Sequence, residues 1–122
     1  MNAISIRTFI GSKHFDQSRE FYKALGFTEY VVGEKLIYFE LQAHIGFYLQ
    51  DYYVKPWVNN SMVFLEVEDV EAWHTKVEQL RLVDQYKHVR CSDIVKESWG
   101  EEFFLHDPEG ILWHFGRFYP RS

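Results

Sequence analysis

His114 stands in an apolar segment, residues 111–118, directly after the tetrapeptide Asp107-Pro108-Glu109-Gly110. An imidazole can bind a transition metal through a ring nitrogen, and it can equally form one polar wall of a metal-free pocket. Proline presets the backbone and glycine tolerates positive φ, so the tetrapeptide predicts a turn between two strands. The role of His114 therefore separates a metalloenzyme from a binding protein.

Covalent chemistry has little support in the sequence. Cys91 is the only cysteine, so it cannot form an internal disulfide, and it has no evident partner for nucleophilic catalysis. Neither a G-x-S-x-G motif nor a phosphate-binding P-loop is present. The histidines show neither His-x-His nor His-Glu-x-x-His spacing, and the carboxylates mark no acid/base pair.

Length and charge narrow the class of protein. A chain of 122 residues normally makes one domain, so we expect residues 1–122 to form a single domain. The net charge of −5, without a run of Lys or Arg, argues against nucleic acid and suits a neutral or cationic ligand. No apolar run is long enough to cross a bilayer or to form a secretory signal, so we expect a cytoplasmic protein without a membrane partner.

The order of predicted elements occurs twice: one strand, one helix and three strands. Gly26 should end the first helix after Leu25, and Asp69 should cap the start of the second. The fold class is therefore α+β, with two βαβββ modules at residues 1–51 and 61–122 joined by a crossing loop at 52–60. The expected strands are residues 4–10, 28–32, 36–41 and 45–50, then 62–67, 88–93, 102–106 and 111–118.

The two modules also align as an internal repeat. Placing Arg7 opposite Met62 puts Leu25 opposite Leu80 without a gap, and Gly46 is aligned with Gly110. Such a repeat indicates two copies of one supersecondary unit, each too small to bury its sheet alone.

Three segments carry a resemblance to a known superfamily: SREFYKALGF (18–27), VEDVEAW (67–73) and WGEEFFLHDPEGILWHF (99–115). The chain resembles the vicinal oxygen chelate superfamily, which includes glyoxalase I, extradiol dioxygenases and the fosfomycin and bleomycin resistance proteins. Within it, the bleomycin resistance group is the most similar. The resemblance implies an open, cup-shaped mixed sheet and a metal-free homodimer that holds a cationic, aromatic drug in crevices shared by two subunits.

In the metal-dependent members, each module supplies one ligand from its first strand and one from its last. Here those positions hold Arg7, then Tyr48 or Gln50, then Met62 and His114. A guanidinium has no lone pair to give and would repel a divalent ion, and a thioether is too soft for the metals concerned. Only His114 is a good ligand, so we expect no metal and no other cofactor.

We expect the same positions to line a pocket for a small molecule instead. Trp99 belongs to this pocket through the resemblance, and Tyr38 if its strand, whose orientation the sequence leaves open, faces the groove. Phe9 and Phe64 lie on the same wall, and packing in a core is the favoured interpretation for both. The predicted ligand-binding residues are Arg7, Tyr38, Tyr48, Gln50, Met62, Phe64, Trp99 and His114.

Two hypotheses follow for the function. In the first, the protein is not an enzyme but a metal-free binding protein that sequesters an aromatic or cationic ligand, with antibiotic resistance as the possible outcome. In the second, it is a divergent glyoxalase-type lyase, isomerase or dioxygenase that uses His114 with a metal. The second rests on fold alone, which is a weak argument for function.

Overall fold

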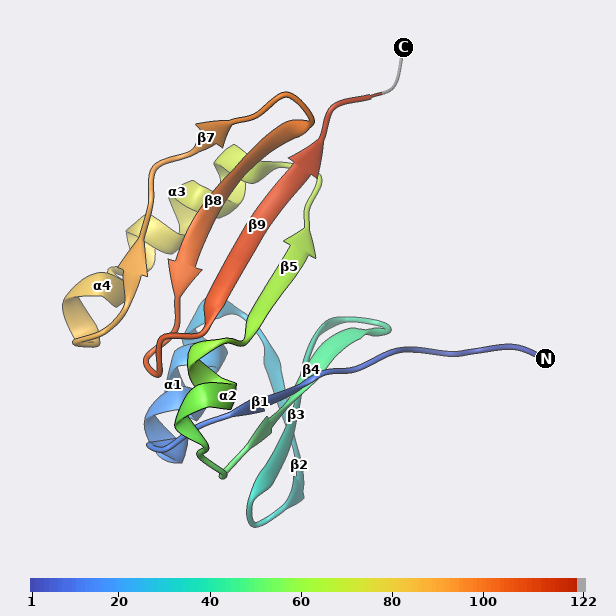
Figure 1. Ribbon diagram of the computed structural model, residues 1–122, viewed down its shortest axis with the longest axis vertical. Coiled ribbons are helices and arrows are strands. Elements are labelled where there is room, and N and C mark those ends of the chain that lie inside the picture. The colour runs from blue at the N-terminus through green and yellow to red at the C-terminus, as the bar shows by residue number, and fades with distance from the viewer. Residues whose placement is uncertain (121–122) are drawn as a thin grey trace. The chain divides into compact units, whose positions relative to one another are not determined.

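The computed structural model describes residues 1–120, and the chain divides into two compact units, Met1–Asn59 and Asn60–Ser122. We call them unit one and unit two and describe each by itself. Each unit contains one mixed sheet and one long helix on a single face of that sheet (Figure 1). The α+β class and the pair of related modules are therefore confirmed. Within residues 1–120, no helix has the length and apolar character needed to cross a membrane.

Unit one contains a four-stranded sheet in the order β1-β4-β3-β2. β1 runs parallel to β4, and the other neighbours are antiparallel, as in a strand–helix–meander unit. The elements are β1 (Phe9–Gly11), α1 (Phe15–Leu25), β2 (Thr28–Gly33), β3 (Leu36–Gln42), β4 (Ile45–Gln50) and α2 (Lys55–Asn59).

Unit two repeats this topology in the order β5-β9-β8-β6, with β7 also paired to β8. β5 runs parallel to β9, and the remaining pairs are antiparallel. The elements are β5 (Met62–Glu66), α3 (Val70–Leu80), α4 (Leu82–Gln85), β6 (Arg90–Cys91), β7 (Val95–Lys96), β8 (Gly100–His106) and β9 (Leu112–Phe118).

The internal repeat is confirmed for the helices and corrected for the last strands. Each end of α3 lies 55 positions after the corresponding end of α1. Phe9 is paired with Tyr48, and its counterpart Phe64 is paired with His114. Tyr48 and His114 are therefore equivalent, and the alignment of Gly46 with Gly110 is wrong by two residues. Gly110 belongs to the turn and not to the strand.

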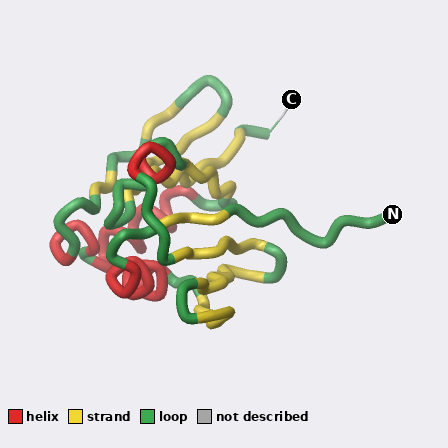
Figure 2. Tube along the Cα trace, turned by 60° about the horizontal axis from the view of Figure 1, so that its bottom comes forward, coloured by secondary structure: helices red, strands yellow, loops and turns green. Residues whose placement is uncertain are grey.

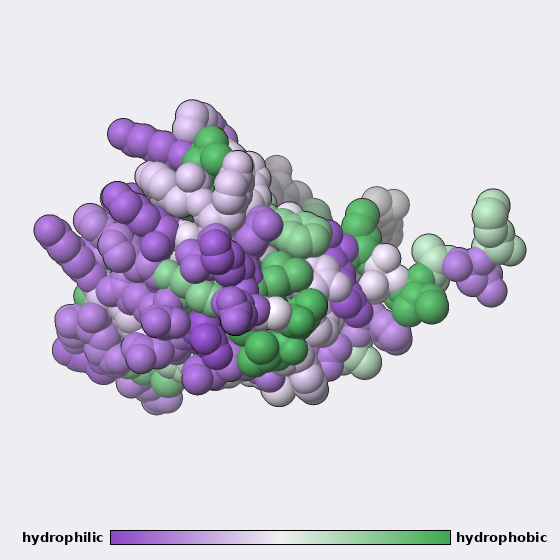
Figure 3. Space-filling model, turned by 90° about the horizontal axis from the view of Figure 1, so that it is seen from below, coloured by the Kyte–Doolittle hydropathy of each residue, from purple (hydrophilic) through white to green (hydrophobic). Residues whose placement is uncertain are grey.

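The first strand is much shorter than predicted. β1 covers only Phe9–Gly11, whereas residues 1–8 extend away from the rest of unit one without regular structure (Figure 2). In the register of β1, only residues before Ile6 would pass the beginning of β4 at Ile45, and the carbonyl of Thr8 still accepts a hydrogen bond of 2.9 Å from the N–H of Tyr48. Ile4 and Ile6 are exposed, and hydrophobic and hydrophilic residues follow one another along this projecting segment (Figure 3).

The end of α1 and the start of α3 lie where the local sequence dictates. Gly26 takes φ 119°, a left-handed conformation that ends α1 and that few residues other than glycine adopt. The carboxylate of Asp69 accepts a hydrogen bond of 3.0 Å from the backbone N–H of Ala72, as an N-cap should. The short elements α2, α4 and β7 are additions to the predicted pattern, and α2 lies within the predicted crossing loop.

Each long helix buries one face of its sheet against aromatic side chains. In unit one, Tyr22 of α1 packs edge-to-face on Phe47 of β4, with ring centroids 4.8 Å apart. In unit two, Trp73 of α3 packs on Phe115, which stacks on Phe103 at 4.8 Å. Side chains alternate along a strand, so the neighbouring residues of the same strands point to the opposite face, away from the helix.

We predict that Gly100→Ala destabilises the protein because β8 begins in close contact with β9. A Cβ at Gly100 would collide with the backbone carbonyl of Arg117, which cannot move without breaking the sheet. The expected loss is about 1–3 kcal/mol of the free energy of unfolding, measured by urea denaturation. Gly33→Ala is the matched control, since a Cβ there meets nothing within 4 Å. Equal stability of the two variants would contradict the close packing described here.

Candidate functional site

The face of the unit-two sheet that points away from α3 carries His114. Residues directly opposite each other on neighbouring strands share a face of the sheet. The pairs on this face include Phe64 with His114, Phe104 with His114, and Glu102 with Gly116. Phe103, Phe115 and Leu105 point to the opposite, helix-covered face, where all three are fully buried. We refer to the face that carries His114 as the open face of unit two.

A hydrogen bond between His114 and Glu102 is the main polar feature of this face. Nδ1 of His114 lies 2.8 Å from Oε1 of Glu102, and Glu102 is only 8% exposed. An ionised carboxylate can only accept, so Nδ1 is the donor and the imidazole is fixed in orientation. Nε2 remains available for a second contact. When the imidazole is neutral, the pair carries one negative charge in a largely apolar setting.

The room for Glu102 comes from the glycine opposite it. Gly116 has no side chain, so the carboxylate can reach diagonally across the sheet to His114. The ring of Phe64 lies over the same space, because a Cβ on Gly116 would collide with its Cζ atom. In the sequence WHFGRF, His114 and Gly116 are two residues apart. The imidazole and the residue without a side chain therefore lie on the same face of β9.

Aromatic rings surround the Glu102–His114 pair. Phe64 stacks on the imidazole with ring centroids 5.9 Å apart, and Phe104 meets it edge-on at 5.1 Å. Trp99 and Phe118 extend the cluster, with centroids 5.0 Å apart, and both contact Phe64. The face thus combines a carboxylate with the ring surfaces that attract cations and planar molecules.

The interpretation of Phe9 and Phe64 as core residues is wrong. Phe9 is 46% exposed and Phe64 is 43% exposed. Both residues stand on the faces that α1 and α3 leave uncovered, so no second layer of their own unit buries them. Their exposure leaves apolar surface on both of these faces.

The turn that precedes β9 sets the position of His114. The buried carboxylate of Asp107 accepts hydrogen bonds from the backbone N–H groups of Glu109, at 2.8 Å, and Ile111, at 2.9 Å. Gly110 takes φ 91°, which confirms the predicted need for a residue that tolerates positive φ. β8 and β9 are thereby joined in fixed register, with Phe104 opposite His114.

The corresponding face of unit one carries a cation instead of a carboxylate. Arg7 donates a hydrogen bond of 2.8 Å to the hydroxyl of Tyr48 and lies 4.1 Å above the ring of Tyr38. The hydrogen bond to Tyr48 raises the pKa of Arg7 further, so its charge is permanent. Phe9 stacks on Tyr48 at 4.8 Å, and Tyr30 stacks on Tyr38 at 6.1 Å.

The structure answers which side of β3 belongs to this face. Tyr38 is paired with Tyr48, and Ile37 and Phe39 point to the helix-covered side. The Tyr38 hydroxyl donates to Glu40 at 3.2 Å, and burial together with this hydrogen bond raises the pKa of Tyr38. Tyr38 therefore acts as a neutral donor at physiological pH.

The eight predicted site residues divide between the two units. Arg7, Tyr38 and Tyr48 are in direct contact in unit one, and Gln50 lies on the same face of β4. In unit two, Phe64 touches both Trp99 and His114, whereas Met62 stands on the edge strand and is 64% exposed.

The positions that the resemblance aligns with metal ligands do not fit a metal ion. The guanidinium of Arg7 is committed to Tyr48, and Nδ1 of His114 is committed to Glu102. Over the part of the chain that the structure describes, no three His, Cys, Asp or Glu residues are grouped as a metal site requires. A catalytic Zn²⁺ needs three protein ligands, and His114 with Glu102 supplies two at most. We therefore derive no step through a metal.

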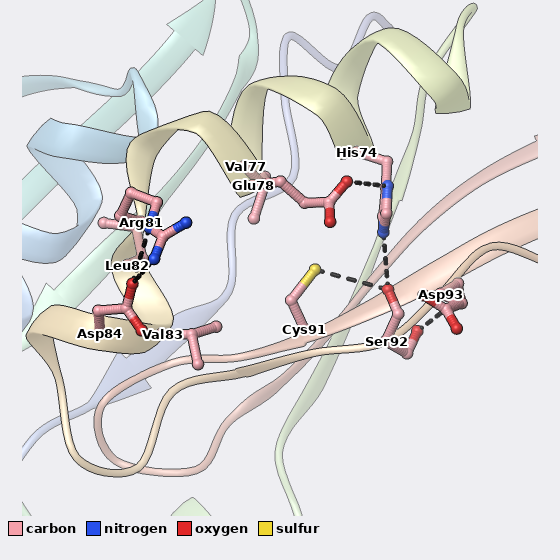
Figure 4. Close-up of a pocket in the computed structure, with 10 residues that line it drawn as sticks. All are labelled: His74, Val77, Glu78, Arg81, Leu82, Val83, Asp84, Cys91, Ser92 and Asp93. Carbon is pink, nitrogen blue, oxygen red and sulfur yellow. Dashed lines mark hydrogen bonds and ion pairs between the residues drawn. The ribbon is translucent and has the colours of Figure 1, made fainter.

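A separate cavity of about 260 Å³ lies on the helix side of unit two, lined by residues of α3, α4 and β6 (Figure 4). His74 contacts Glu78 through Nδ1 at 3.1 Å and the carbonyl of Ser92 through Nε2 at 2.8 Å. The Cys91 thiol points to the same carbonyl at 3.6 Å. Burial raises the pKa of Cys91 to about 11, so the thiol is a poor nucleophile.

Sequence reasoning missed the central role of Glu102. In the sequence, Glu102 lies beside Glu97 and Glu101 near Trp99, and nothing in its immediate neighbours distinguishes it from them. The alternation of β8 carried a usable signal, because Glu102 and Phe104 fall on one face and Phe103 and Leu105 on the other. The partner could not be identified from β8 alone, since it depends on the register with β9.

Comparisons with solved structures identify the fold. A bleomycin-binding protein complexed with bleomycin matches at TM-score 0.79 and 16% identity, over 96% of this chain and 100% of that one. The bleomycin-binding protein of Streptomyces verticillus complexed with copper(II)-bleomycin matches at TM-score 0.78 and 17% identity, over 94% and 96%. Lactoylglutathione lyase of Agrobacterium tumefaciens matches at TM-score 0.72 and 15% identity, over 96% of both chains.

Comparisons of the sequence found no relative, because no protein-family model and no curated protein matches this chain. These three structural matches are each below 20% identity, so they show the fold and not the function. The chain has the glyoxalase/bleomycin resistance fold, as the resemblance of its sequence predicts.

We predict that Cys91 reacts slowly with iodoacetamide. A thiol of pKa about 11 is thiolate far less often at pH 8 than an ordinary cysteine, so alkylation should be on the order of a hundredfold slower than for a free cysteine. The rate is measured by mass spectrometry of the intact folded protein, with the urea-unfolded protein as control. A folded rate close to the unfolded rate would show that the thiol is neither buried nor raised in pKa.

Proposed function

We propose that this protein binds an aromatic, cationic small molecule on the open face of unit two and releases it unchanged. The observation that carries the proposal is the nearly buried carboxylate of Glu102, oriented by His114 and surrounded by exposed rings. A carboxylate in such surroundings is stabilised by an incoming cation more than a solvated one would be. The rings supply stacking surface and cation–π attraction.

The shared fold supports the same proposal. Two of the matching structures are bleomycin-binding proteins solved with bleomycin or copper(II)-bleomycin. We extend this to the class of ligand and not to bleomycin itself, because identity is only 16–17%. The proposal also includes sequestration without turnover, resistance to an antibiotic, a homodimer with a shared crevice and a cytoplasmic location.

The test uses three probes with one ring system: 2-naphthylmethylammonium, the neutral 2-naphthylmethanol and the anionic 2-naphthoate. We expect calorimetric titration to show that the ammonium binds more tightly than the alcohol, and that Glu102→Gln removes this preference. The expected loss is about tenfold in Kd, since hydrogen bonds to charged groups contribute roughly 1.5–3 kcal/mol before screening. Metal-free bleomycin serves as a larger probe of the same class.

Glu97→Gln is the matched control, because Glu97 is an exposed glutamate of the same segment and its loss removes the same charge. We expect the ammonium to bind this variant as it binds the unmodified protein. Equal binding of ammonium and alcohol, or an unchanged preference in Glu102→Gln, would refute the proposed site. Stoichiometric metal in protein purified without chelator, together with turnover, would favour the glyoxalase-type alternative.

A further inference from the structure

A recess of about 460 Å³ lies at the other end of the open face of unit two, where β6 pairs with β8. Its surface is mostly carbon. No carboxylate lines it. The lining residues are Arg90, Cys91, Ser92, Phe104, His106 and Leu112.

Arg90 supplies a positive charge that no carboxylate neutralises. Its side chain is exposed, and among residues 1–120 it has no ion-pair partner. Other arginines of the described chain are engaged: Arg19 with Glu29, at 2.9 Å, and Arg81 with Asp84, at 2.7 Å. An unpaired guanidinium beside an apolar recess is suited to a planar anion, which it can hold through two parallel hydrogen bonds.

His106 stands next to Arg90 on the same face, since the two residues are directly paired between β6 and β8. Burial, and to a smaller extent the charge of Arg90, lowers the pKa of His106. The imidazole is consequently neutral at pH 7 and can donate one N–H without adding charge. The carbon surface of Phe104 and Leu112 completes the recess and excludes a strongly hydrated ion.

We propose that this recess binds the carboxylate of an apolar or aromatic acid, with Arg90 as the charge partner, His106 as a neutral donor and Phe104 and Leu112 against the hydrocarbon. It is a second subsite of opposite polarity to the Glu102–His114 pair. Glu102 and His106 are four residues apart on β8, so they are separated by roughly 13 Å along the strand. A single ligand that reaches both subsites is therefore elongated, with its cation and anion at opposite ends.

The experiment titrates 2-naphthoate into ¹⁵N-labelled protein and follows backbone amide shifts. We expect the changes to centre on Arg90, His106 and Leu112, and Arg90→Gln to weaken binding by about tenfold or more. Arg90→Lys should retain part of the affinity, because it keeps the charge and loses the two-pronged geometry. Lys76→Gln is the matched control, since it removes one positive charge from the exposed side of α3.

A second measurement follows the imidazole of His106 by NMR in the unmodified protein. Saturating 2-naphthoate adds a negative charge beside His106 and relieves the effect of Arg90, so its pKa should rise toward the ordinary value. In the free protein, the lowered pKa of His106 means that its imidazole is protonated at a lower pH in the folded state than in the unfolded state. Stability therefore falls as the pH drops below about 6.5, and bound 2-naphthoate should reduce this loss.

The proposal is overturned if 2-naphthoate shifts no amide at the recess, if Arg90→Gln binds it as well as the control does, or if the pKa of His106 does not move. These results are independent of the cation site. Glu102→Gln should abolish the preference for 2-naphthylmethylammonium and leave the binding of 2-naphthoate intact. Arg90→Gln should do the reverse, so either subsite can fail without the other.

Discussion

A hydrogen bond between an imidazole and a nearly buried carboxylate governs the chemistry of this molecule. Glu102 is 8% exposed and its Oε1 atom lies 2.8 Å from Nδ1 of His114. The contact is possible because Gly116 places no side chain opposite Glu102 and because the turn at Asp107 fixes the register of β8 and β9. A buried carboxylate needs a compensating partner, and here the partner is the Nδ1 donor of His114. The carboxylate of Glu102 is the basis of the proposed preference of this face for cations.

The two units show how one topology accommodates opposite chemistry. Tyr48 and His114 are equivalent in register, and each stands beside an exposed phenylalanine. In unit one the polar group that completes the face is the permanent cation of Arg7, which lies over the ring of Tyr38. In unit two it is the carboxylate of Glu102. Neither unit offers the ligands of a catalytic metal on this face. Unit one presents the cation of Arg7, and unit two presents two donors, Glu102 and His114, where three are required. The fold therefore persists while the side chains on its open faces determine what it can bind.

The sequence predicts those features that depend on neighbours along the chain. Asp69 caps α3, Gly26 ends α1, and the Asp107–Gly110 turn joins β8 to β9, because each of these depends on a few adjacent residues. The sequence does not predict features that depend on contacts with another strand. The first strand covers only Phe9–Gly11, and residues before Ile6 lie beyond the beginning of β4 at Ile45. Phe9 and Phe64 are exposed because the helix covers the other face. The Glu102–His114 contact depends on the register between two strands, which periodicity within one strand does not fix.

The central claim is that the open face of unit two, with Glu102 and His114 at its centre, is where a cationic aromatic ligand binds. The most direct measurement is an isotope-filtered NOE experiment on ¹³C-labelled protein with unlabelled 2-naphthylmethylammonium. We predict contacts from the naphthyl protons to the rings of Phe64 and Trp99 and to the imidazole of His114. Contacts confined to Val77 and Leu82 in the cavity behind the sheet, or to the tyrosines of unit one, would contradict the account.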